Sequence, residues 1–151
     1  MRDEEWRELR ELRLEALRDS PDAFWTLHEE ALERTDADWR EWTTFACHVA
    51  VDDGRLVGMV AGFPDEEDPE AADLIAMYVR PDARGRGIGT ALVDAQLGWA
   101  RAEGFTRMLL MVNVEQTSAF RLYERCGFSD TGERSLLRDG PHKLATMARD
   151  L

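Results

Sequence analysis

The N-terminal part of the chain repeats apolar residues with the period of an α-helix. Between Trp6 and Leu17 an apolar side chain recurs every three or four residues, while Glu and Arg fill the other positions. The Ser20-Pro21-Asp22 segment ends this pattern, because proline cannot continue a helix. The pattern therefore predicts an amphipathic first helix with one face against a core.

Two shorter helices are predicted before the period changes. The first holds Ala31-Leu32, and the second starts near Asp36 or Asp38, either of which can serve as its N-cap. This second helix is expected to bury Trp39 and Trp42.

From Cys47 onward the pattern is typical of β-strands. Cys47 to Val51 and Leu56 to Phe63 are predicted strands, joined by an Asp52-Asp53-Gly54 turn with glycine at the left-handed position. The apolar run from Leu74 to Val79 indicates a central strand covered on both faces. Pro81 ends it, because proline donates no hydrogen bond to a ladder.

The rest of the chain predicts a helix, a strand, a second helix and two closing strands. Gly104 and Gly127 end the two helices, and Thr117 or Ser118 can cap the second one. The expected segments are Ile88 to Gly104, Met108 to Val112, Thr117 to Gly127, Phe128 to Arg134 and Leu144 to Ala148. No repeat or linker interrupts this order, so one α/β or α+β domain over residues 1–151 is expected.

Composition and charge narrow the class of protein. A chain of 151 residues with 44% hydrophobic and 33% charged residues is neither disordered, collagenous nor a coiled coil. It contains no apolar run of the roughly 20 residues that a membrane helix needs and no signal peptide, which favours the cytoplasm. The net charge of -12 disfavours nucleic acid and anionic lipid and favours amine-bearing partners. No Cys/His cluster indicates a metal site.

The segment Arg84-Gly85-Arg86-Gly87-Ile88-Gly89-Thr90 joins the central strand to the following helix. Its glycines let the backbone come close to a ligand, and its N–H groups form an anion site together with the first turn of the helix. The third glycine comes one residue too early for a Rossmann fingerprint, and the lysine of a Walker loop is absent. A tight turn without a ligand is the alternative interpretation.

Two segments resemble a known family. The Arg-x-x-Gly-x-Gly spacing of residues 84–89 resembles the pyrophosphate loop of the GNAT superfamily of N-acetyltransferases. Residues 113–128 resemble its second signature, with Asn113 after a strand, then Ala, Leu-Tyr and Gly-Phe. The resemblance extends from about Cys47 to the C-terminal residues and is tightest over 74–128.

The resemblance implies a central mixed, mostly antiparallel sheet of about six strands, splayed in the middle and flanked by helices. Family members usually begin with a strand, whereas this chain reaches its helix within a few residues of Met1. Either the first strand is missing or the chain begins internally. Gln116 also stands where the family often has a second Asn, so altered hydrogen-bond geometry is expected there.

The resemblance further implies acetyl-CoA as co-substrate, used by direct transfer without a metal or a covalent enzyme intermediate. Its pantetheine arm is expected between two splayed strands, and a backbone N–H near Met77 or Tyr78 would stabilise the thioester oxyanion. The residues implied in coenzyme binding are Met77, Tyr78, Val79, Arg84, Gly85, Arg86, Gly87, Ile88, Gly89, Thr90, Asn113, Ser118 and Tyr123.

Two catalytic residues are carried over from the family. Tyr123 corresponds to the usual general acid that protonates the departing thiolate, although its place on an apolar helix face also suits a packing role. Asp73 stands eleven residues before Arg84, where some members carry a Glu that acts as a base through water. An exposed or paired carboxylate is the alternative there. His48 and Glu29 are further candidates for the base.

The acceptor pocket is expected in the variable parts of the chain. Phe24, Trp25 and His28, with the acidic loop Asp65 to Glu70, would suit a small cationic amine or a peptide N-terminus. The aromatic residues can equally pack in the core. The predicted function is N-acetyl transfer to a primary amine through a ternary complex. The alternative is a non-catalytic acyl-CoA sensor or regulatory module of the same fold. The acceptor, the acyl-chain preference and the oligomeric state, a homodimer included, are left open.

Overall fold

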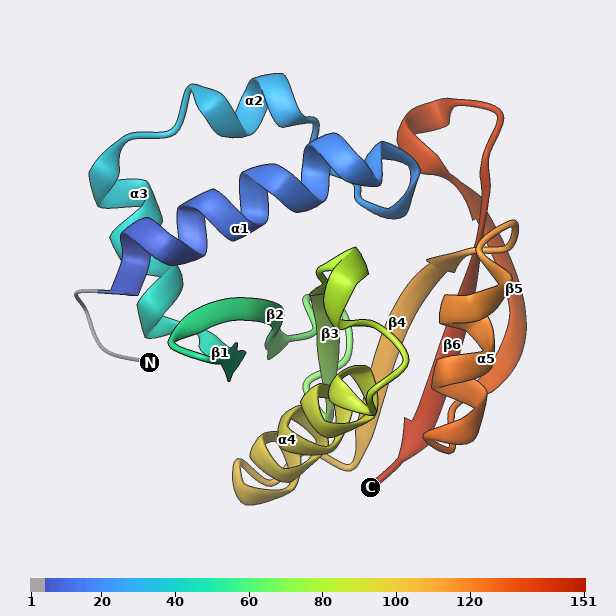
Figure 1. Cartoon of the computed structure of the whole chain (residues 1–151). Helices are drawn as coiled ribbons and strands as arrows, with labels where there is room; N and C mark the ends of the chain where they lie inside the picture. The colour runs from blue at the N-terminus through green and yellow to red at the C-terminus, as the bar shows by residue number, and fades with distance from the viewer. Residues whose placement is uncertain (1–4) are drawn as a thin grey trace.

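The computed structural model describes residues 5–151 and contains one six-stranded sheet flanked by helices (Figure 1). The strand order is β1-β2-β3-β4-β6-β5, and only the β3–β4 pair is parallel. The elements are α1 (Trp6–Asp19), α2 (His28–Leu32), α3 (Asp36–Glu41), β1 (Ala46–Asp52), β2 (Arg55–Pro64), β3 (Ala71–Val79), α4 (Ile88–Ala102), β4 (Arg107–Asn113), α5 (Thr117–Arg125), β5 (Ser129–Leu136) and β6 (Lys143–Asp150), with short 3₁₀ helices η2 (Pro21–Ala23), η3 (Trp42–Thr44), η4 (Pro81–Ala83) and η5 (Leu137–Asp139). The predicted mixed, mostly antiparallel sheet is confirmed.

The helices form two layers, one on each side of the sheet (Figure 1). Helices α1, α2 and α3 pack on β1 and β2 through a buried cluster that contains Trp39 and Leu12. Helices α4 and α5 pack on the other face through a second cluster around Leu97 and Met147. The two clusters together separate the sheet from water on both sides of β2 and β3.

The expected helices and strands are present, but two of the expected caps are wrong. Helix α3 is capped by Thr35, whose hydroxyl accepts from the N–H of Asp38, while the Asp38 carboxylate accepts from the N–H of Thr35. Neither Asp36 nor Asp38 is the N-cap, because this reciprocal capping box is satisfied only one residue earlier. Helix α5 begins at Thr117 after Gln116, without a side-chain cap.

Among the described residues no strand precedes α1, which begins at Trp6. Residues 1–4 lie outside the described chain, so both explanations for the missing first strand stay open. Within the described part no helix is long and apolar enough to cross a membrane.

A β-bulge divides β3 into two halves. Ile75 pairs with Ala61 and Tyr78 pairs with Met59, so Ala76 and Met77 together face a single residue of β2. Ala76 adopts a left-handed backbone with φ 56°, which is unusual for a residue other than glycine. Before the bulge Ala72 and Leu74 belong to the α4 cluster, whereas after it Met77 and Val79 do. The bulge thus shifts the alternation of side chains by one residue.

One buried amide joins α4 to the edge strand β1. The Gln96 side chain is fully buried, its Nε2 donates to the Ala46 carbonyl at 3.0 Å and its Oε1 lies 2.8 Å from His48 Nδ1. It passes over Gly62 on β2, where an added Cβ would lie 2.1 Å from Gln96 Nε2 and 3.0 Å from the Asp73 carbonyl oxygen. Glycine at position 62 is therefore required by the path of Gln96.

We predict that Gly62→Ala lowers the free energy of unfolding by about 1–3 kcal/mol, because the methyl group displaces a buried, hydrogen-bonded amide. Gly98→Ala is the matched control, since Gly98 lies inside α4 and an added Cβ meets no atom within 4 Å. Helix propensity alone makes this control neutral or more stable by up to about 1 kcal/mol. Urea unfolding measures both, and equal stability of the two variants contradicts the role of Gly62.

Candidate active site

A cavity of about 540 Å³ opens where β3 ends and α4 begins. Its wall combines the glycine loop, the end of β3, one side of α5 and the segment that follows α1. Of the residues expected to bind the coenzyme, those that line it are Met77, Tyr78, Val79, Arg84, Gly85, Gly87, Ile88, Gly89, Thr90 and Ser118. The structure thus brings the two sequence signatures to one cavity.

The glycine loop lines this cavity, and most of its main-chain N–H groups have no acceptor within the described part of the chain. Gly85 and Gly87 have φ of 76° and 82°, a conformation that other residues rarely adopt. Gly87 is the N-cap of α4 and offers no side-chain oxygen to the first turn. Among the described residues, no hydrogen-bond acceptor is found for the N–H groups of residues 85–90. An anion can bind there without displacing an internal partner.

The end of β3 adds a second set of unpaired backbone groups. β3 pairs with β4 only from Ala71 to Asp73, opposite residues 107–109. From Leu74 onward the two parallel strands diverge, as Figure 1 shows, and β3 has no strand partner on that side. An extended group inserted there can hydrogen-bond like an added strand.

Arg84 lies at the cavity wall but is engaged inside the protein. Its Nε donates to the Val79 carbonyl at 2.8 Å, and its Nη2 lies 3.4 Å from the Asp19 carboxylate at the end of α1. The same carboxylate oxygen accepts from the Tyr78 hydroxyl at 3.2 Å. Burial and the nearby charge of Asp19 raise the pKa of Tyr78 to about 12, so this hydroxyl stays a donor at neutral pH. No sequence motif pointed to Asp19.

Arg86 and Asn113 lie outside the cavity wall. Arg86 points to the β1–β2 turn, where its Nη2 lies 3.0 Å from an Asp52 carboxylate oxygen. Asn113 is buried, its Nδ2 donates to the Asp22 carbonyl at 3.0 Å, and its Oδ1 accepts from the N–H of Glu115. Both ends of the Asn113 amide hold loops together, and a contact of either residue with a coenzyme stays a prediction.

Tyr123 is buried in the α4–α5 cluster instead of lining the cavity. Its ring packs edge-on against Phe128, with 6.0 Å between the ring centroids. Burial, and to a lesser degree Cys126, raises the pKa of Tyr123, so the hydroxyl remains protonated. Other side chains of α5, Leu122 and Arg125, line the cavity in its place and were missed from the sequence, because the motif marks the tyrosine.

Asp73 is the last residue of β3 that pairs with β4, at the point where these two strands begin to diverge. Burial is the largest cause that raises the pKa of its carboxyl group to about 7, followed by a hydrogen bond with Asp65 and the charges of Asp65 and Glu66. Asp65 has a lowered pKa, in first place because of the same bond. Below about pH 7 the proton of this carboxyl pair therefore lies on Asp73, while Asp65 stays ionised. Asp73 does not line the cavity wall.

The expected acceptor residues are dispersed. Phe24 lines the cavity, with the buried guanidinium of Arg13 stacked 4.6 Å from its ring centre. Trp25 is 57% exposed, and His28 begins α2. The acidic loop lies between β2 and β3, at the end of β3 away from the glycine loop, and Asp68 in it pairs with Arg107 at 3.7 Å.

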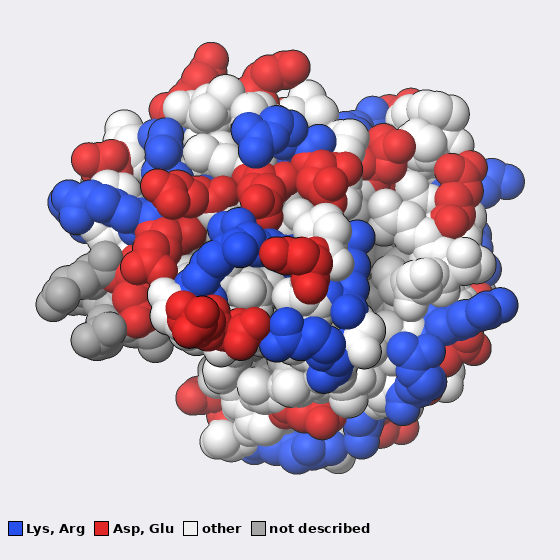
Figure 2. All heavy atoms as spheres, in the orientation of Figure 1, with Lys and Arg blue, Asp and Glu red and all other residues white. Residues whose placement is uncertain are grey.

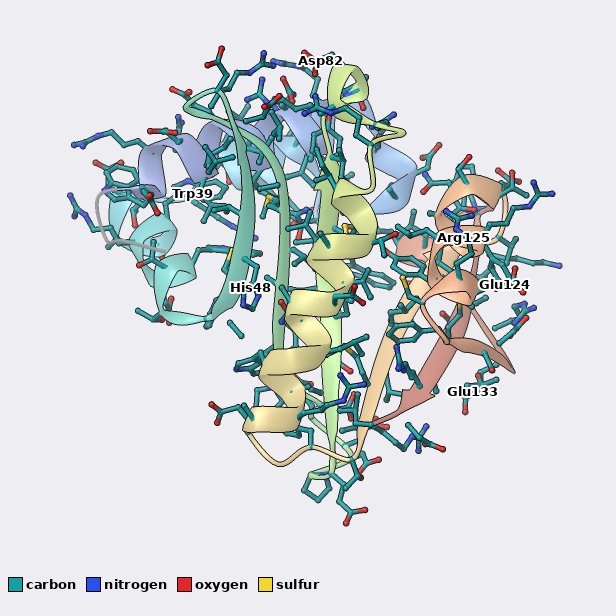
Figure 3. The ribbon with its side chains drawn as sticks, turned by 60° about the horizontal axis from the view of Figure 1, so that its bottom comes forward. Trp39, His48, Asp82, Glu124, Arg125 and Glu133 are labelled. Carbon is teal, nitrogen blue, oxygen red and sulfur yellow. The ribbon has the colours of Figure 1, made fainter. Side chains whose placement is uncertain are left out.

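The further base candidates are away from the cavity wall. His48 lies on the edge strand β1 beside α4, whereas Arg125 lies on α5, as Figure 3 shows. Glu29 is exposed on α2. Among the described residues no group of three or more His, Cys, Asp and Glu side chains could hold a metal ion. Acidic and basic side chains are interspersed over the face shown in Figure 2, consistent with a net charge that is spread over the surface.

Known proteins resemble this chain in sequence and in fold. The model of the acetyltransferase (GNAT) family matches residues 6–128. An uncharacterized N-acetyltransferase of Methanocaldococcus jannaschii is 38% identical over 90 residues, which cover 57% of this chain and 38% of that protein. The chain spans about two fifths of the length of the curated relatives it matches.

Two solved structures extend the likeness over the whole chain. A GCN5-related N-acetyltransferase from Kribbella flavida is 26% identical with a TM-score of 0.80, covering 100% of this chain and 95% of that one. A putative acetyltransferase from Salmonella typhimurium, solved with acetyl-CoA, has a TM-score of 0.84 at 16% identity and covers 100% and 91% of the two chains. At that identity the second likeness concerns the fold alone.

We predict that the carboxyl carbon of Asp73 titrates with a midpoint near pH 7 in an NMR experiment, in line with its raised pKa of about 7. Asp65→Asn lowers this midpoint, because it removes a neighbouring negative charge. Glu66→Gln removes the smallest contribution to the raised pKa of Asp73 and therefore lowers the midpoint less.

The same pKa shift sets the pH dependence of stability. The folded protein holds this proton more tightly than the unfolded chain, whose carboxyl has the ordinary value of 3.8. The contribution of Asp73 to the free energy of unfolding therefore declines as the pH rises from 3.8 to about 7, and Asp73→Asn removes this contribution. A midpoint near pH 4 in the unchanged protein contradicts the raised pKa of Asp73.

Proposed function

The chain belongs to the GNAT family of acetyltransferases, and from this we propose that it moves the acetyl group of acetyl-CoA to a primary amine by direct transfer in a ternary complex. Residues 1–151 are proposed to act as one GNAT domain. The observation that carries the proposal is the glycine loop, whose unpaired N–H groups face a cavity beside an unpaired strand edge. These are the two backbone surfaces that a diphosphate and an extended pantetheine arm require.

The glycine loop and the end of β3 would hold the donor. The N–H groups of residues 85–90 and the positive end of the α4 dipole favour the diphosphate. The free edge from Leu74 to Val79 suits the amide groups of the pantetheine arm. A main-chain N–H near Met77 or Tyr78 would then donate to the thioester oxygen, and one such preorganised donor typically contributes ~3 kcal/mol to transition-state binding.

The reaction requires two proton transfers. A lysine-like amine with a pKa of about 10.4 must lose a proton before its nitrogen attacks the carbonyl carbon. Asp73 is proposed to accept it through water, because its carboxyl pKa of about 7 leaves much of it ionised at neutral pH and it lies beyond the cavity wall. As the C–S bond breaks, the thiolate takes a proton, for which the protonated hydroxyl of Tyr123 is proposed as donor.

The acceptor is proposed to be a cationic amine or a peptide N-terminus. Phe24 offers an aromatic wall inside the cavity, and Asp19 places a carboxylate close to Ser20 and Tyr78 at its edge. An aromatic face beside a carboxylate favours an ammonium group. The excess of acidic over basic residues also attracts a cationic acceptor over longer distances.

A second function has its own support. Tyr123 is buried away from the cavity wall, and Asn113 is fully engaged with loops. Both features suit an acyl-CoA-binding module that senses the coenzyme without catalysis. The glycine loop is compatible with either function, so turnover distinguishes them.

We expect calorimetric binding of acetyl-CoA together with thiol release in a screen of amines, polyamines, aminoglycosides and peptides.

Gly87→Val weakens acetyl-CoA binding at least about tenfold, because a β-branched residue strains a backbone with φ 82° and turns N–H groups away from the ligand. Gly54→Val is the matched control, since Gly54 has φ 75° in the β1–β2 turn, outside the cavity wall, and is equally open. Binding without turnover on any acceptor supports the sensor, and unchanged affinity in Gly87→Val rejects the phosphate site.

Tyr123→Phe tests the general acid. We predict a turnover roughly ten- to a hundredfold slower, because the thiolate must leave without a proton from the enzyme. Some activity remains, since a thiol of pKa about 8.5 is a tolerable leaving group. Acetyl-CoA affinity and the thermal midpoint serve as controls for packing beside Phe128. A turnover equal to that of the unchanged protein assigns Tyr123 to the core alone.

A further inference from the structure

Two ion pairs join α1 to the segment between β3 and the glycine loop. Glu15 and Asp19 lie one turn apart on α1, and they face Arg80 and Arg84, which are also four residues apart. The Glu15–Arg80 pair is 3.2 Å long, with side chains 29% and 18% exposed. The Asp19–Arg84 pair is 3.4 Å long, with side chains 40% and 50% exposed. The first pair is thus the better shielded and the second the more easily broken.

Asp19 occupies an unfavourable place for a carboxylate. It is the last residue of α1, where the helix dipole is negative, so it depends on neighbouring donors. These are the Arg84 guanidinium, the Tyr78 hydroxyl at 3.2 Å and the Ser20 hydroxyl at 3.1 Å. Ser20, Tyr78 and Arg84 all line the cavity. The carboxylate therefore holds three parts of the cavity wall together.

Arg84 is placed to exchange partners. Its Nε bond to the Val79 carbonyl keeps the guanidinium at the cavity beside the free N–H groups of the glycine loop. A diphosphate in that loop carries more charge than Asp19 and matches the fork of a guanidinium. We propose that Asp19 is a positioning residue that holds Arg84 in the free protein and yields it to the diphosphate of coenzyme A. This inference rests on the proposed function, because it requires that coenzyme A binds this loop.

The exchange connects the two sides of the cavity. While Glu15 and Arg80 keep α1 docked, release of Arg84 leaves the Asp19 carboxylate with the hydroxyl groups of Tyr78 and Ser20 alone. Binding of the coenzyme thereby leaves the negative charge of Asp19 without its arginine, beside the segment that leads to Phe24. Asp19 also competes with the coenzyme for Arg84, so removing its charge strengthens coenzyme binding.

The test is calorimetric titration with coenzyme A, whose free thiol prevents turnover. We expect Asp19→Asn to bind coenzyme A roughly two- to fivefold more tightly than the unchanged protein. The gain is small because the exposed ion pair that competes for Arg84 is weak. Arg84→Gln binds about tenfold more weakly, because a charge-assisted contact to the diphosphate is lost. In the Arg84→Gln background, Asp19→Asn brings no further gain. Pantetheine, which lacks the diphosphate, binds all these variants alike.

Asp52→Asn is the matched control. It removes one carboxylate from an equally exposed pair with Arg86 of the same loop, at 3.0 Å and 47% and 50% exposure, but Arg86 does not line the cavity. The inference is overturned if Asp19→Asn binds no more tightly than Asp52→Asn, or if its gain persists without Arg84. Damage to the fold would weaken binding, so a tighter complex cannot arise that way. Failure of the unchanged protein to bind coenzyme A overturns the proposed function as well.

Discussion

The separation of β3 from β4 is the constraint on which the site depends. The two strands pair over three residues and then diverge, which breaks the backbone ladder in the middle of the sheet. Unpaired backbone groups inside a protein are costly unless water or a ligand satisfies them. The sheet tolerates this opening because strong antiparallel pairing continues on both sides, from β1 to β3 and from β4 through β6 to β5.

Polar contacts between distant segments hold the opening in place. Asn113 at the end of β4 binds the Asp22 carbonyl beyond α1, and Arg138 in the β5–β6 connection donates to carbonyls of the same loop, among them that of Pro21 at 3.4 Å. His142 lies 3.5 Å from the Asp22 carboxylate. Figure 1 shows that the loop after α1 and the β5–β6 connection meet at this end of the molecule. The α1 layer is thus anchored to the far half of the sheet across the opening.

Charge and burial act together around the cavity. Arg84 contacts a carboxylate on one side and stands next to free N–H groups on the other. Burial keeps the Tyr78 hydroxyl protonated at neutral pH and raises the pKa of the Asp73 carboxyl group to about 7. A protein that is acidic overall still presents a site for an anion, because main-chain dipoles and one arginine determine the electrostatic potential at the glycine loop.

The sequence alone determined the order of helices and strands, the glycine loop and the family, because these depend on local periodicity and on motifs read over short distances. It placed Tyr123 in its motif but could not show that the ring turns into the core, since position on a helix face does not fix what that face meets. Asp19, Arg138 and the Gln96–Gly62 contact carry no local signal. Asp19 lies 65 residues from Arg84, Arg138 lies 114 residues from Phe24, and Gln96 lies 34 residues from Gly62. Only the packing of α1 and α4 on the sheet decided those contacts, and with them the charges around the site.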